Sequence, residues 1–498
     1  MMCDDEGWVL FVFLTLGPSL LCDIRLLRAP LHSSRRAPLI RSALFALVAL
    51  VERFAEVNLQ PKADLFLEAI RNVGYSFDTA VADILDNSIA ADASTIDLCS
   101  SFTAENGMPS LAICDNGFGM NPEKLLDSMR FAHQELATIR SGNDLGRFGL
   151  GMKLASLSQA RSVLVIAKQK GERATAACWD IDYIKQVGDW ILQSYVGENA
   201  ELAIVEILTQ YGLEDVFDDW NREHDSGVMV CWLSIDRFTV ENLSLRLANL
   251  RNHLSLVFHR YLEGVVTKKI SIRVEGKKVL PVDPYLLSHP YSSSADMLTN
   301  NGVRVQAHVL PYMTELRDED WNLLGQTANK SKKTLQSGFY IYRVNRLIVW
   351  GKWFGIVTDI ATRKLVRVEL DIDSVKDEEW NLDVRKSRAE IPTSYYPFIV
   401  SSIALALERS RRKIIHVSNN TDKGGEHAPL WVFTEDKETW ALRVNRESRL
   451  MKELKGLLAE NKGKLNQFLD ELEAYFPYEA LRARYQSFDL EGGDYDRE

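Results

Sequence analysis

The sequence has few cysteines, and no two of them have the C-x-x-C spacing of a metal or redox site. The six, among 498 residues, are Cys3, Cys22, Cys99, Cys114, Cys178 and Cys231. This scatter indicates neither a zinc site nor a disulfide framework. Cys99 and Cys114 fall in apolar, strand-like runs and are expected to be reduced core residues, which favours a cytoplasmic protein.

The chain also lacks an excess of basic residues. Its net charge of −10 and pI near 5.6 exclude a chain-wide positive field for holding nucleic acid. Local basic segments are Lys268-Lys269 with Lys277-Lys278, Lys330 to Lys333, and Arg409 to Lys413. Such runs are most often solvated faces. A nucleic-acid groove built from one or two of them is the alternative.

Long apolar runs are missing as well. Trp8 to Leu21 is too short to span a bilayer comfortably, and it follows acidic residues, the wrong sign for a secretory signal. A second apolar stretch is Ala43 to Val51. One interpretation of the leader, residues 1–58, is a membrane-associated hairpin. We favour a start codon assigned too far upstream, with the native protein beginning near Val57, and expect no stable membrane insertion.

Three short blocks are the most informative residues present, and the first is Ala82-Asp83-Ile84-Leu85-Asp86-Asn87-Ser88-Ile89-Ala90. On the helix predicted from Phe77 to Ala93, Asp83 and Asn87 share one face about one turn apart. The carboxylate can orient and deprotonate a water, while the amide oxygen helps to hold Mg²⁺ against phosphates. A polar stripe on an ordinary surface helix would have the same spacing.

The second block is Asp115-Asn116-Gly117-Phe118-Gly119-Met120, directly after an apolar run, Leu111 to Cys114, that predicts a buried strand. Gly117 and Gly119 permit a positive φ or a close approach of ligand. A carboxylate at a strand end, such as Asp115, can accept a hydrogen bond from the exocyclic amine of adenine. An ordinary hairpin turn is the alternative.

The third block is Gly146-Arg147-Phe148-Gly149-Leu150-Gly151, ahead of a helix predicted from Met152 to Gln159. Glycines at a helix N-terminus expose backbone N–H groups to anions, and the helix dipole favours a phosphate there. One such cluster is weak support for a nucleotide site, whereas three ordered blocks are specific.

In this order and at this spacing, the blocks resemble those of the GHKL superfamily, which includes the ATPases of DNA gyrase B subunits, MutL, heat-shock chaperones, MORC proteins and sensor histidine kinases. The resemblance implies an α+β fold, with a two-layer α/β sandwich of the Bergerat type that binds ATP and Mg²⁺. By position it assigns the catalytic acid to Asp83, the metal-binding amide to Asn87, adenine binding to Asp115 with Gly117, Gly119 and Met120, and the lid-hinge glycines to Gly146, Gly149 and Gly151.

Two departures from the family pattern concern hydrolysis. Hydrolytic members usually carry Glu where this chain has Asp83, whose side chain is one methylene shorter. The base can therefore sit too far from the attacking water, or reach it through a backbone adjustment or a second water. Three residues after Asn87, relatives often have Asp where this chain has Ala90. ATP binding is thus better supported than fast hydrolysis.

The ATP-binding domain is predicted over residues 59–237. Asn121 to Leu145, with a polar tip, is the expected ATP lid. Gln186 to Asp225 is acidic and helical and looks like an insertion, and Gly227 to Ile235 is expected to close the sheet.

A transducer-like α/β domain is predicted over residues 238–405, with strands that include Ile270 to Val274. Tyr340 to Arg346 resembles the "F-V-N-x-R" strand and turn of MutL and gyrase relatives. Asn381 to Arg388 resembles the loop that carries a lysine to the γ-phosphate in that family. The resemblance makes Lys386 the candidate catalytic γ-phosphate sensor, and a solvated basic loop is the alternative.

A helical tail is predicted over residues 406–498, ending in a disordered acidic segment. Its apolar residues recur at helical spacing, among them Leu450, Leu454, Leu465 and Leu469. We expect this stripe to dock on the chain's own transducer domain, and self-association is the alternative.

The whole pattern predicts an ATP-driven switch that hydrolyses ATP slowly and closes or homodimerises in the ATP state. It is most similar to bacterial MORC-like or MutL-like ATP-binding proteins. This similarity implies an ATPase subunit in a DNA-directed process such as restriction or phage defence, with DNA or a DNA-processing complex as the partner. A chaperone-like protein clamp is the second hypothesis, although no large client-binding domain follows residue 405. A sensor kinase ranks third.

Overall fold

The computed structural model describes residues 8–16, 22–30, 61–72, 74–105, 107–131, 151–265, 267–358, 361–377, 379–381, 389–420, 430–435, 440–458 and 461–475. The chain forms two compact units, Met1–Pro61 and Lys62–Glu498. In the first unit, β1 (Trp8–Leu16) and β2 (Cys22–Pro30) pair antiparallel. Within the described ranges, no helix combines the length and the apolar character needed to cross a membrane.

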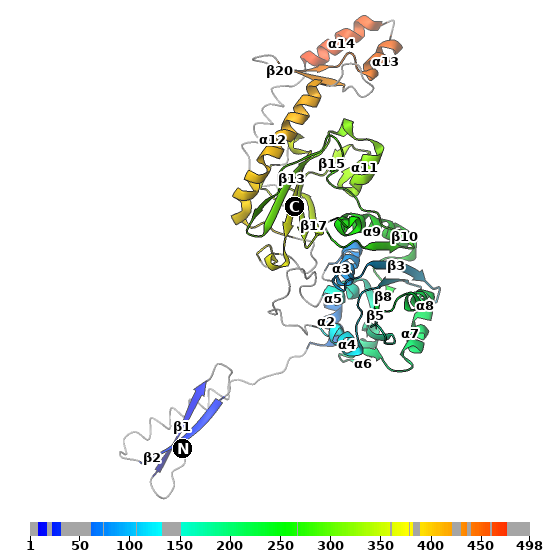
Figure 1. The fold of residues 1–498 in the computed structure, drawn as a ribbon, viewed down its shortest axis with the longest axis vertical. Helices are drawn as coiled ribbons and strands as arrows, with labels where there is room; N and C mark the ends of the chain where they lie inside the picture. Colours follow the sequence, from blue (N-terminus) through cyan, green and yellow to red (C-terminus); the bar gives the residue numbers. More distant parts are fainter. Residues whose placement is uncertain are drawn as a thin grey trace. The chain divides into compact units, whose positions relative to one another are not determined.

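The second unit contains two mixed sheets (Figure 1). The larger has eight strands in the order β10-β9-β3-β4-β8-β5-β6-β7. They are β3 (Thr95–Phe102), β4 (Pro109–Asp115), β5 (Ala160–Lys168), β6 (Thr175–Asp180), β7 (Gln193–Tyr195), β8 (Gly227–Ile235), β9 (Ser271–Val274) and β10 (Lys277–Lys278). β9 pairs in parallel with β3, and all other neighbours in this sheet are antiparallel.

Helices cover both faces of the larger sheet, which is why every residue of β4 is buried. One face carries α2 (Ala63–Ile70), α3 (Phe77–Ala90), α4 (Pro122–Met129), α5 (Gly151–Gln159), α6 (Ile181–Val187), α9 (Leu243–Val257) and α10 (His259–Glu263). The other carries α7 (Ala200–Thr209) and α8 (Glu214–Glu223), packed on the sheet through residues such as Leu208 and Trp220. The predicted α+β sandwich is confirmed. The segment predicted as an insertion covers its second face.

The smaller sheet has the strand order β11-β13-β18-β16-β17, with β12 paired to β13. Its strands are β11 (Ser293–Ser294), β12 (Leu298–Asn300), β13 (Val303–Val309), β16 (Gly338–Arg343), β17 (Arg346–Lys352) and β18 (Val366–Ile372). The long helix α12 (Tyr396–Asn420) packs on it through Ile399, Ile403 and Ala406. Beside it lie α11 (Asp318–Leu324) and the short hairpin β14 (Ala328–Asn329) and β15 (Thr334–Leu335).

One strand belongs to a different sheet from the one expected. The sequence predicts Ile270 to Val274 in the second domain, but β9 pairs with β3 in the larger sheet. Sequence order does not reveal this, because the chain leaves the sheet after β8, crosses its face as α9 and α10, and returns to its edge. The larger sheet therefore uses residues as far as Lys278.

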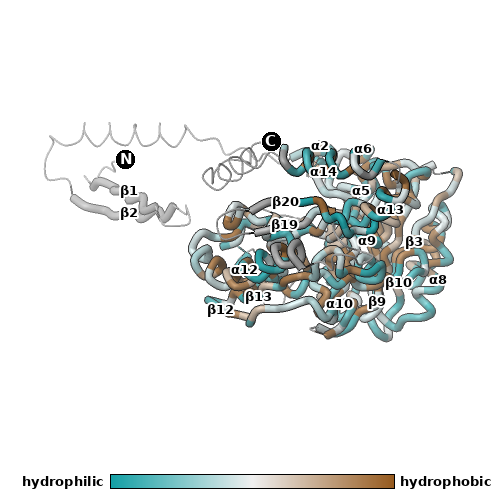
Figure 2. Tube along the Cα trace, turned by 90° about the horizontal axis from the view of Figure 1, so that it is seen from above, coloured by the Kyte–Doolittle hydropathy of each residue, from teal (hydrophilic) through white to brown (hydrophobic). Residues whose placement is uncertain are grey.

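The tail contains a hairpin that the sequence pattern did not predict, β19 (Trp431–Glu435) and β20 (Trp440–Val444). Helices α13 (Arg449–Leu457) and α14 (Lys462–Ala474) follow it. Met451, Leu465 and Leu469 form a small core with Val444, so part of the apolar stripe is buried within the tail itself. In Figure 2 hydrophobic segments run through the interior of the body, whereas α8 at its edge is largely hydrophilic.

Candidate ATP-binding site

The structure brings the first two sequence blocks and the last residue of the third together along α3. Ser88 of the first block donates a hydrogen bond to Asp115 Oδ2 of the second, at 2.7 Å. Gly151, the last residue of the third block, begins α5, and a Cβ added there would lie 4.0 Å from Asp83 Oδ2. Gly146 and Gly149 lie outside the described residues, as do residues 132–145 of the expected lid.

Asp115, the predicted adenine acceptor, is buried at the end of β4 and already holds three donors. The backbone N–H groups of Gly117 and Val228 donate to Oδ1 at 2.8 and 3.2 Å, and Ser88 donates to Oδ2. Burial raises the pKa of this carboxyl, although these hydrogen bonds act in the opposite direction. Since each oxygen can accept two hydrogen bonds, Oδ2 retains one acceptor position for a ligand amine.

The glycines beside Asp115 serve the chain's own packing. Gly119 has φ +67°, and a Cβ there would lie 1.8 Å from the carbonyl oxygen of Lys168. A Cβ on Gly117 would lie 2.7 Å from the carbonyl oxygen of Ala91, at the end of α3. The positive φ predicted for this turn is found at Gly119, and both glycines let backbone segments approach each other closely. Met120 is half-buried and packs on the same core as α3.

Asn116 fixes this turn, a role that the sequence reading missed. Its Oδ1 accepts from the backbone N–H groups of Ser94 and Thr95 at 2.8 and 2.9 Å, and its Nδ2 donates to Ser94 Oγ. The second block is therefore tied to the start of β3 rather than forming an isolated hairpin. Asn at this position is ordinary turn chemistry, so its particular partners could not be read from the sequence.

Asp83, the predicted base, is enclosed, with only 2% of its surface exposed. The hydroxyl of Tyr75 donates to Oδ2 at 3.0 Å, and Arg346 Nη1 donates to Oδ1 at 3.0 Å. Helix α3 begins about two turns before this position, after the N-cap Ser76, whose hydroxyl accepts from the N–H of Thr79.

Asp86 completes a buried charge cluster with Asp83 and Arg346. The same Arg346 nitrogen contacts Asp86 Oδ2, and both residues are almost fully buried, with exposed fractions of 1% for Asp86 and 3% for Arg346. The ring of Phe258 lies 5.6 Å from the guanidinium carbon. Arg346 is the last residue of the "F-V-N-x-R"-like element that the sequence analysis identified. Its contacts with Asp83 and Asp86 were not predicted.

Asn87, the predicted metal ligand, is exposed on α3 one turn from Asp83. Mg²⁺ commonly takes only one or two protein groups and completes its shell with waters and substrate phosphates. An exposed amide at the phosphate end of the site fits that requirement, and a bound ion there would neutralise phosphate charge. In the described ranges no three His, Cys, Asp or Glu residues cluster as a metal site.

Of two lysines considered for phosphate contact, the structure describes one. Lys153, in the first turn of α5, is buried and donates to the carbonyl oxygen of Ser128 at 2.6 Å. Burial lowers its pKa to about 8. Lys386, the predicted γ-phosphate sensor, lies outside the described residues, as do residues 382–388 around it.

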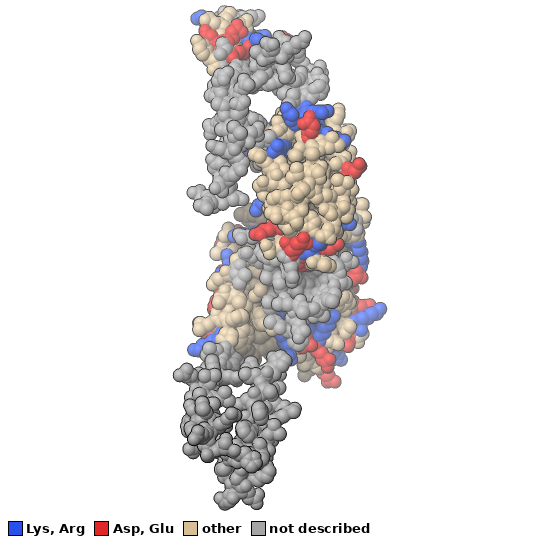
Figure 3. All heavy atoms as spheres, turned by 90° about the vertical axis from the view of Figure 1, so that its left-hand side faces the viewer, with Lys and Arg blue, Asp and Glu red and all other residues tan. Residues whose placement is uncertain are grey.

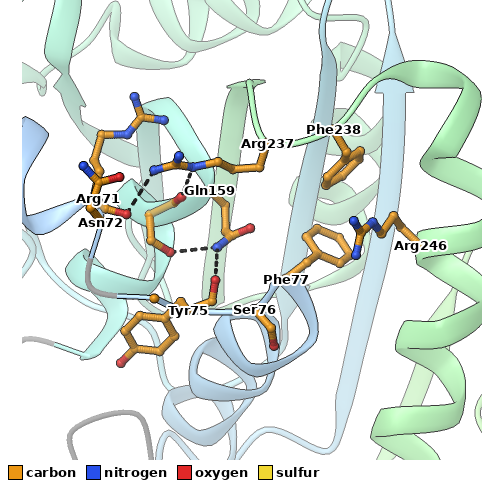
Figure 4. Close-up of a pocket in the computed structure, with 11 residues that line it drawn as sticks. Arg71, Asn72, Tyr75, Ser76, Phe77, Gln159, Arg237, Phe238 and Arg246 are labelled. Atoms are coloured by element: carbon orange, nitrogen blue, oxygen red, sulfur yellow. Dashed lines mark hydrogen bonds between the residues drawn. The ribbon is translucent and has the colours of Figure 1, made fainter. Parts of the chain in front are cut away.

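A cavity of about 320 Å³ adjoins the start of α3, and Figure 4 shows the residues around it. Its lining includes Arg71, Tyr75, Gln159, Arg237 and Arg246, but none of the predicted site residues. Arg71 pairs with Asp236 and donates to the Leu157 carbonyl oxygen, while Arg237 donates to the Ser158 carbonyl oxygen. These arginines therefore tie α2, α5 and the end of β8 together.

Comparison with known proteins identifies a related domain in this part of the chain. Residues 75–210 match the family described as "Histidine kinase-, DNA gyrase B-, and HSP90-like ATPase". A segment of 117 residues is 31% identical to the ATPase morc-1 of Caenorhabditis elegans. That match covers 24% of this chain and 12% of the worm protein. The chain therefore contains an ATPase domain of the GHKL superfamily, similar to that of a MORC ATPase.

Proposed function

We propose that this chain is an ATP-driven conformational switch, which binds ATP with Mg²⁺ and hydrolyses it slowly, as an ATPase subunit in a DNA-directed process such as restriction or phage defence. The observation that carries the nucleotide part is the hydrogen bond from Ser88 to Asp115. It joins the candidate adenine acceptor to the helix that bears Asp83 and Asn87, so that one short span can serve both ends of ATP.

In the proposed reaction, Asp83 accepts a proton from the attacking water. The water oxygen forms a bond to the γ-phosphorus, and the bond from that phosphorus to the bridging oxygen breaks, which leaves ADP and phosphate. Asn87 would hold Mg²⁺, which lowers the charge repulsion among the phosphates. The side chain of Asp83 is one methylene shorter than the family's Glu, and this supports slow turnover.

The conformational part rests on the contact between the two sheets at α3. ATP, unlike ADP, offers a terminal phosphate to Lys386, so closure or homodimerisation in the ATP state is proposed to depend on that contact. Because a ligand shifts an equilibrium only through differential contacts with the two states, ADP should leave the open form populated.

The basic segments favour DNA contact through a partner. Lys268 lies 2.6 Å from Asp92, Lys330 lies 2.9 Å from Asp318, and Lys413 lies 3.3 Å from Glu315. In Figure 3 acidic and basic side chains lie in small groups of both signs, and much of the described part of this face is uncharged. One lysine in each of these segments is thus paired with a carboxylate, and a DNA-processing complex is the proposed partner.

Limited proteolysis of the lid tests the switch. A non-hydrolysable ATP analogue should protect residues 121–145 from protease, whereas ADP should not. Lys386→Ala should erase this difference while leaving the affinity for ADP nearly unchanged, because ADP has no group for that lysine to contact. Equal protection by both nucleotides in the wild-type protein would contradict the switch.

Turnover measurements separate the candidate processes. Phosphate release that rises with DNA and the partner complex would support the DNA-directed role. Release that rises only with unfolded protein clients would favour the chaperone-like clamp and contradict that role.

A further inference from the structure

The smaller sheet contributes one charged side chain to the helix that bears the candidate base. We propose that Arg346 is a positioning residue for Asp83, so that the placement of the smaller sheet sets the rate of hydrolysis. The inference rests on the proposed ATPase reaction and goes beyond it by naming the group that holds the base.

The geometry fixes Asp83 from two sides. Arg346 Nη1 lies 3.0 Å from Oδ1, and the Tyr75 hydroxyl lies 3.0 Å from Oδ2. The two partners are far apart in the sequence, one just before α3 and one at the start of β17. A carboxylate held at both oxygens has one orientation, and this orientation decides where its proton-accepting oxygen points.

The charges make Arg346 necessary to this arrangement. Asp83 and Asp86 are three residues apart on α3 and are both buried, so without a cation their carboxylates would repel each other. Arg346 contacts both. Among the described residues, the groups near the cluster include Tyr75, Tyr261, His253 and the ring of Phe258.

The hairpin that presents Arg346 is strained. Strands β16 and β17 are joined by Val344 and Asn345, with φ of +47° and +64°. Asn adopts such values readily, whereas a β-branched valine rarely does. The Tyr261 hydroxyl holds the turn by donating to the Val344 carbonyl oxygen at 2.6 Å. Strain of this kind persists where the surroundings fix the backbone. Here the fixed turn directly precedes Arg346 and so sets the position of its side chain.

A second arginine on the same hairpin offers a matched control. Arg343 forms a two-pronged pair with Asp377, with distances of 2.7 and 2.8 Å, and it is equally buried. This pair lies within the smaller sheet's part of the chain. Substitution at Arg343 therefore changes a similarly buried ion pair, one whose carboxylate belongs to Asp377 and not to Asp83.

The test compares Arg346→Lys with Arg343→Lys by steady-state phosphate release. We expect Arg346→Lys to lower kcat by about a hundredfold, because misplaced catalytic groups cost that much. Its KM for ATP should stay within about twofold of the wild-type value, since the adenine contacts at Asp115 are unchanged. Arg343→Lys should change kcat by less than about threefold.

A charge-balanced variant separates positioning from folding. Arg346→Gln leaves two buried carboxylates without their cation and is expected to lower the melting temperature. Adding Asp86→Asn removes one charge of each sign and should recover much of that temperature, while kcat stays low. Recovery of kcat together with melting temperature would show that Arg346 only stabilises the fold.

The outcomes distinguish this inference from the proposed function. A wild-type protein that binds ATP and releases no phosphate would overturn both. Wild-type turnover with an unchanged kcat in Arg346→Lys would overturn the positioning role alone. Equal losses of kcat in Arg346→Lys and Arg343→Lys would do the same, because they would trace to stability.

Discussion

Arg346 and Asp83 lie 3.0 Å apart, although 263 residues separate them in the chain. The contact joins the start of β17 in the smaller sheet to the middle of α3 on the larger one. Since both side chains are buried, the candidate catalytic helix reaches its final electrostatic environment only when the smaller sheet is folded against it. The site is therefore a product of both sheets.

Replacement of Asp83 tests its role as the base. Asp83→Asn should keep ATP binding and lose phosphate release by about a hundredfold or more, since a positioned general base contributes 10²–10⁴. Calorimetry measures the binding and a phosphate assay measures the turnover. Wild-type turnover in this variant would show that another group activates the water.

The longer side chain of Glu should have two effects at this position. Asp83→Glu restores the family's reach and is expected to retain turnover. However, Asp83 is enclosed by Tyr75 and Arg346, so an added methylene should cost about 1–3 kcal/mol of unfolding free energy. Chemical denaturation measures this cost. An unchanged midpoint together with lost turnover would contradict both expectations.

The adenine acceptor is tested by Asp115→Asn. In the carboxylate, Oδ1 accepts from the N–H groups of Gly117 and Val228, and Oδ2 accepts from Ser88. An amide has only one accepting oxygen, so it cannot keep these hydrogen bonds and also accept one from the adenine amine. ATP affinity should fall by about 10- to 100-fold, as expected for a hydrogen bond to a charged group. Asp97→Asn on the neighbouring strand β3 is the control, because Asp97 pairs with Arg273 away from the site. Equal affinities of the two variants would remove Asp115 from the pocket.

The sequence could predict the local elements of the site, because each block combines a helical or strand pattern with residues of defined chemistry. Helix α3 spans Phe77–Ala90, within the predicted range, and β4 ends at Asp115 as expected. The partners could not be predicted in the same way. Asp86 has the pattern of any helical acid, and only the return of the chain at β17 brings Arg346 to it.

The sequence also did not predict which sheet the strand β9 joins. The pattern of Ile270 to Val274 predicts a strand, but a strand's residues do not say which edge they will join. Its parallel pairing with β3 depends on the path of α9 and α10. The tail hairpin was missed for a different reason, because the helical spacing of the leucines beyond residue 449 dominated the reading of that region.

A comparison of two glycines with similar φ separates the cost of a left-handed backbone from the cost of a steric clash of the added Cβ. Gly107 has φ +69° with nothing within 4 Å of an added Cβ, whereas Gly119 has φ +67° and meets the Lys168 carbonyl at 1.8 Å. Gly107→Ala should therefore cost only the left-handed backbone energy, about 1–2 kcal/mol. Gly119→Ala should cost at least about twice as much. Similar losses in chemical denaturation would mean that the Gly119 turn moves away from β5 at little cost.

The last prediction concerns pH, through His253 on α9. Burial, and next the charge of Arg346, lower the pKa of His253 to about 4. In the unfolded chain this pKa is near 6.5. Between these values the unfolded state binds more protons, so the contribution of His253 to stability is fully present above about pH 6.5. That contribution falls as the pH is lowered toward 4.

The side chain is half-buried, which limits the size of this effect to about 1–3 kcal/mol. Denaturation of the wild-type protein and of His253→Gln at pH 7 and at pH 4.5 measures it, since the variant should lose less stability on acidification. NMR titration provides a second measurement. Removal of the Arg346 charge in Arg346→Gln with Asp86→Asn should raise the pKa of His253. Parallel losses of stability in wild type and variant would contradict the assignment, because acid unfolding would then arise from carboxylates alone.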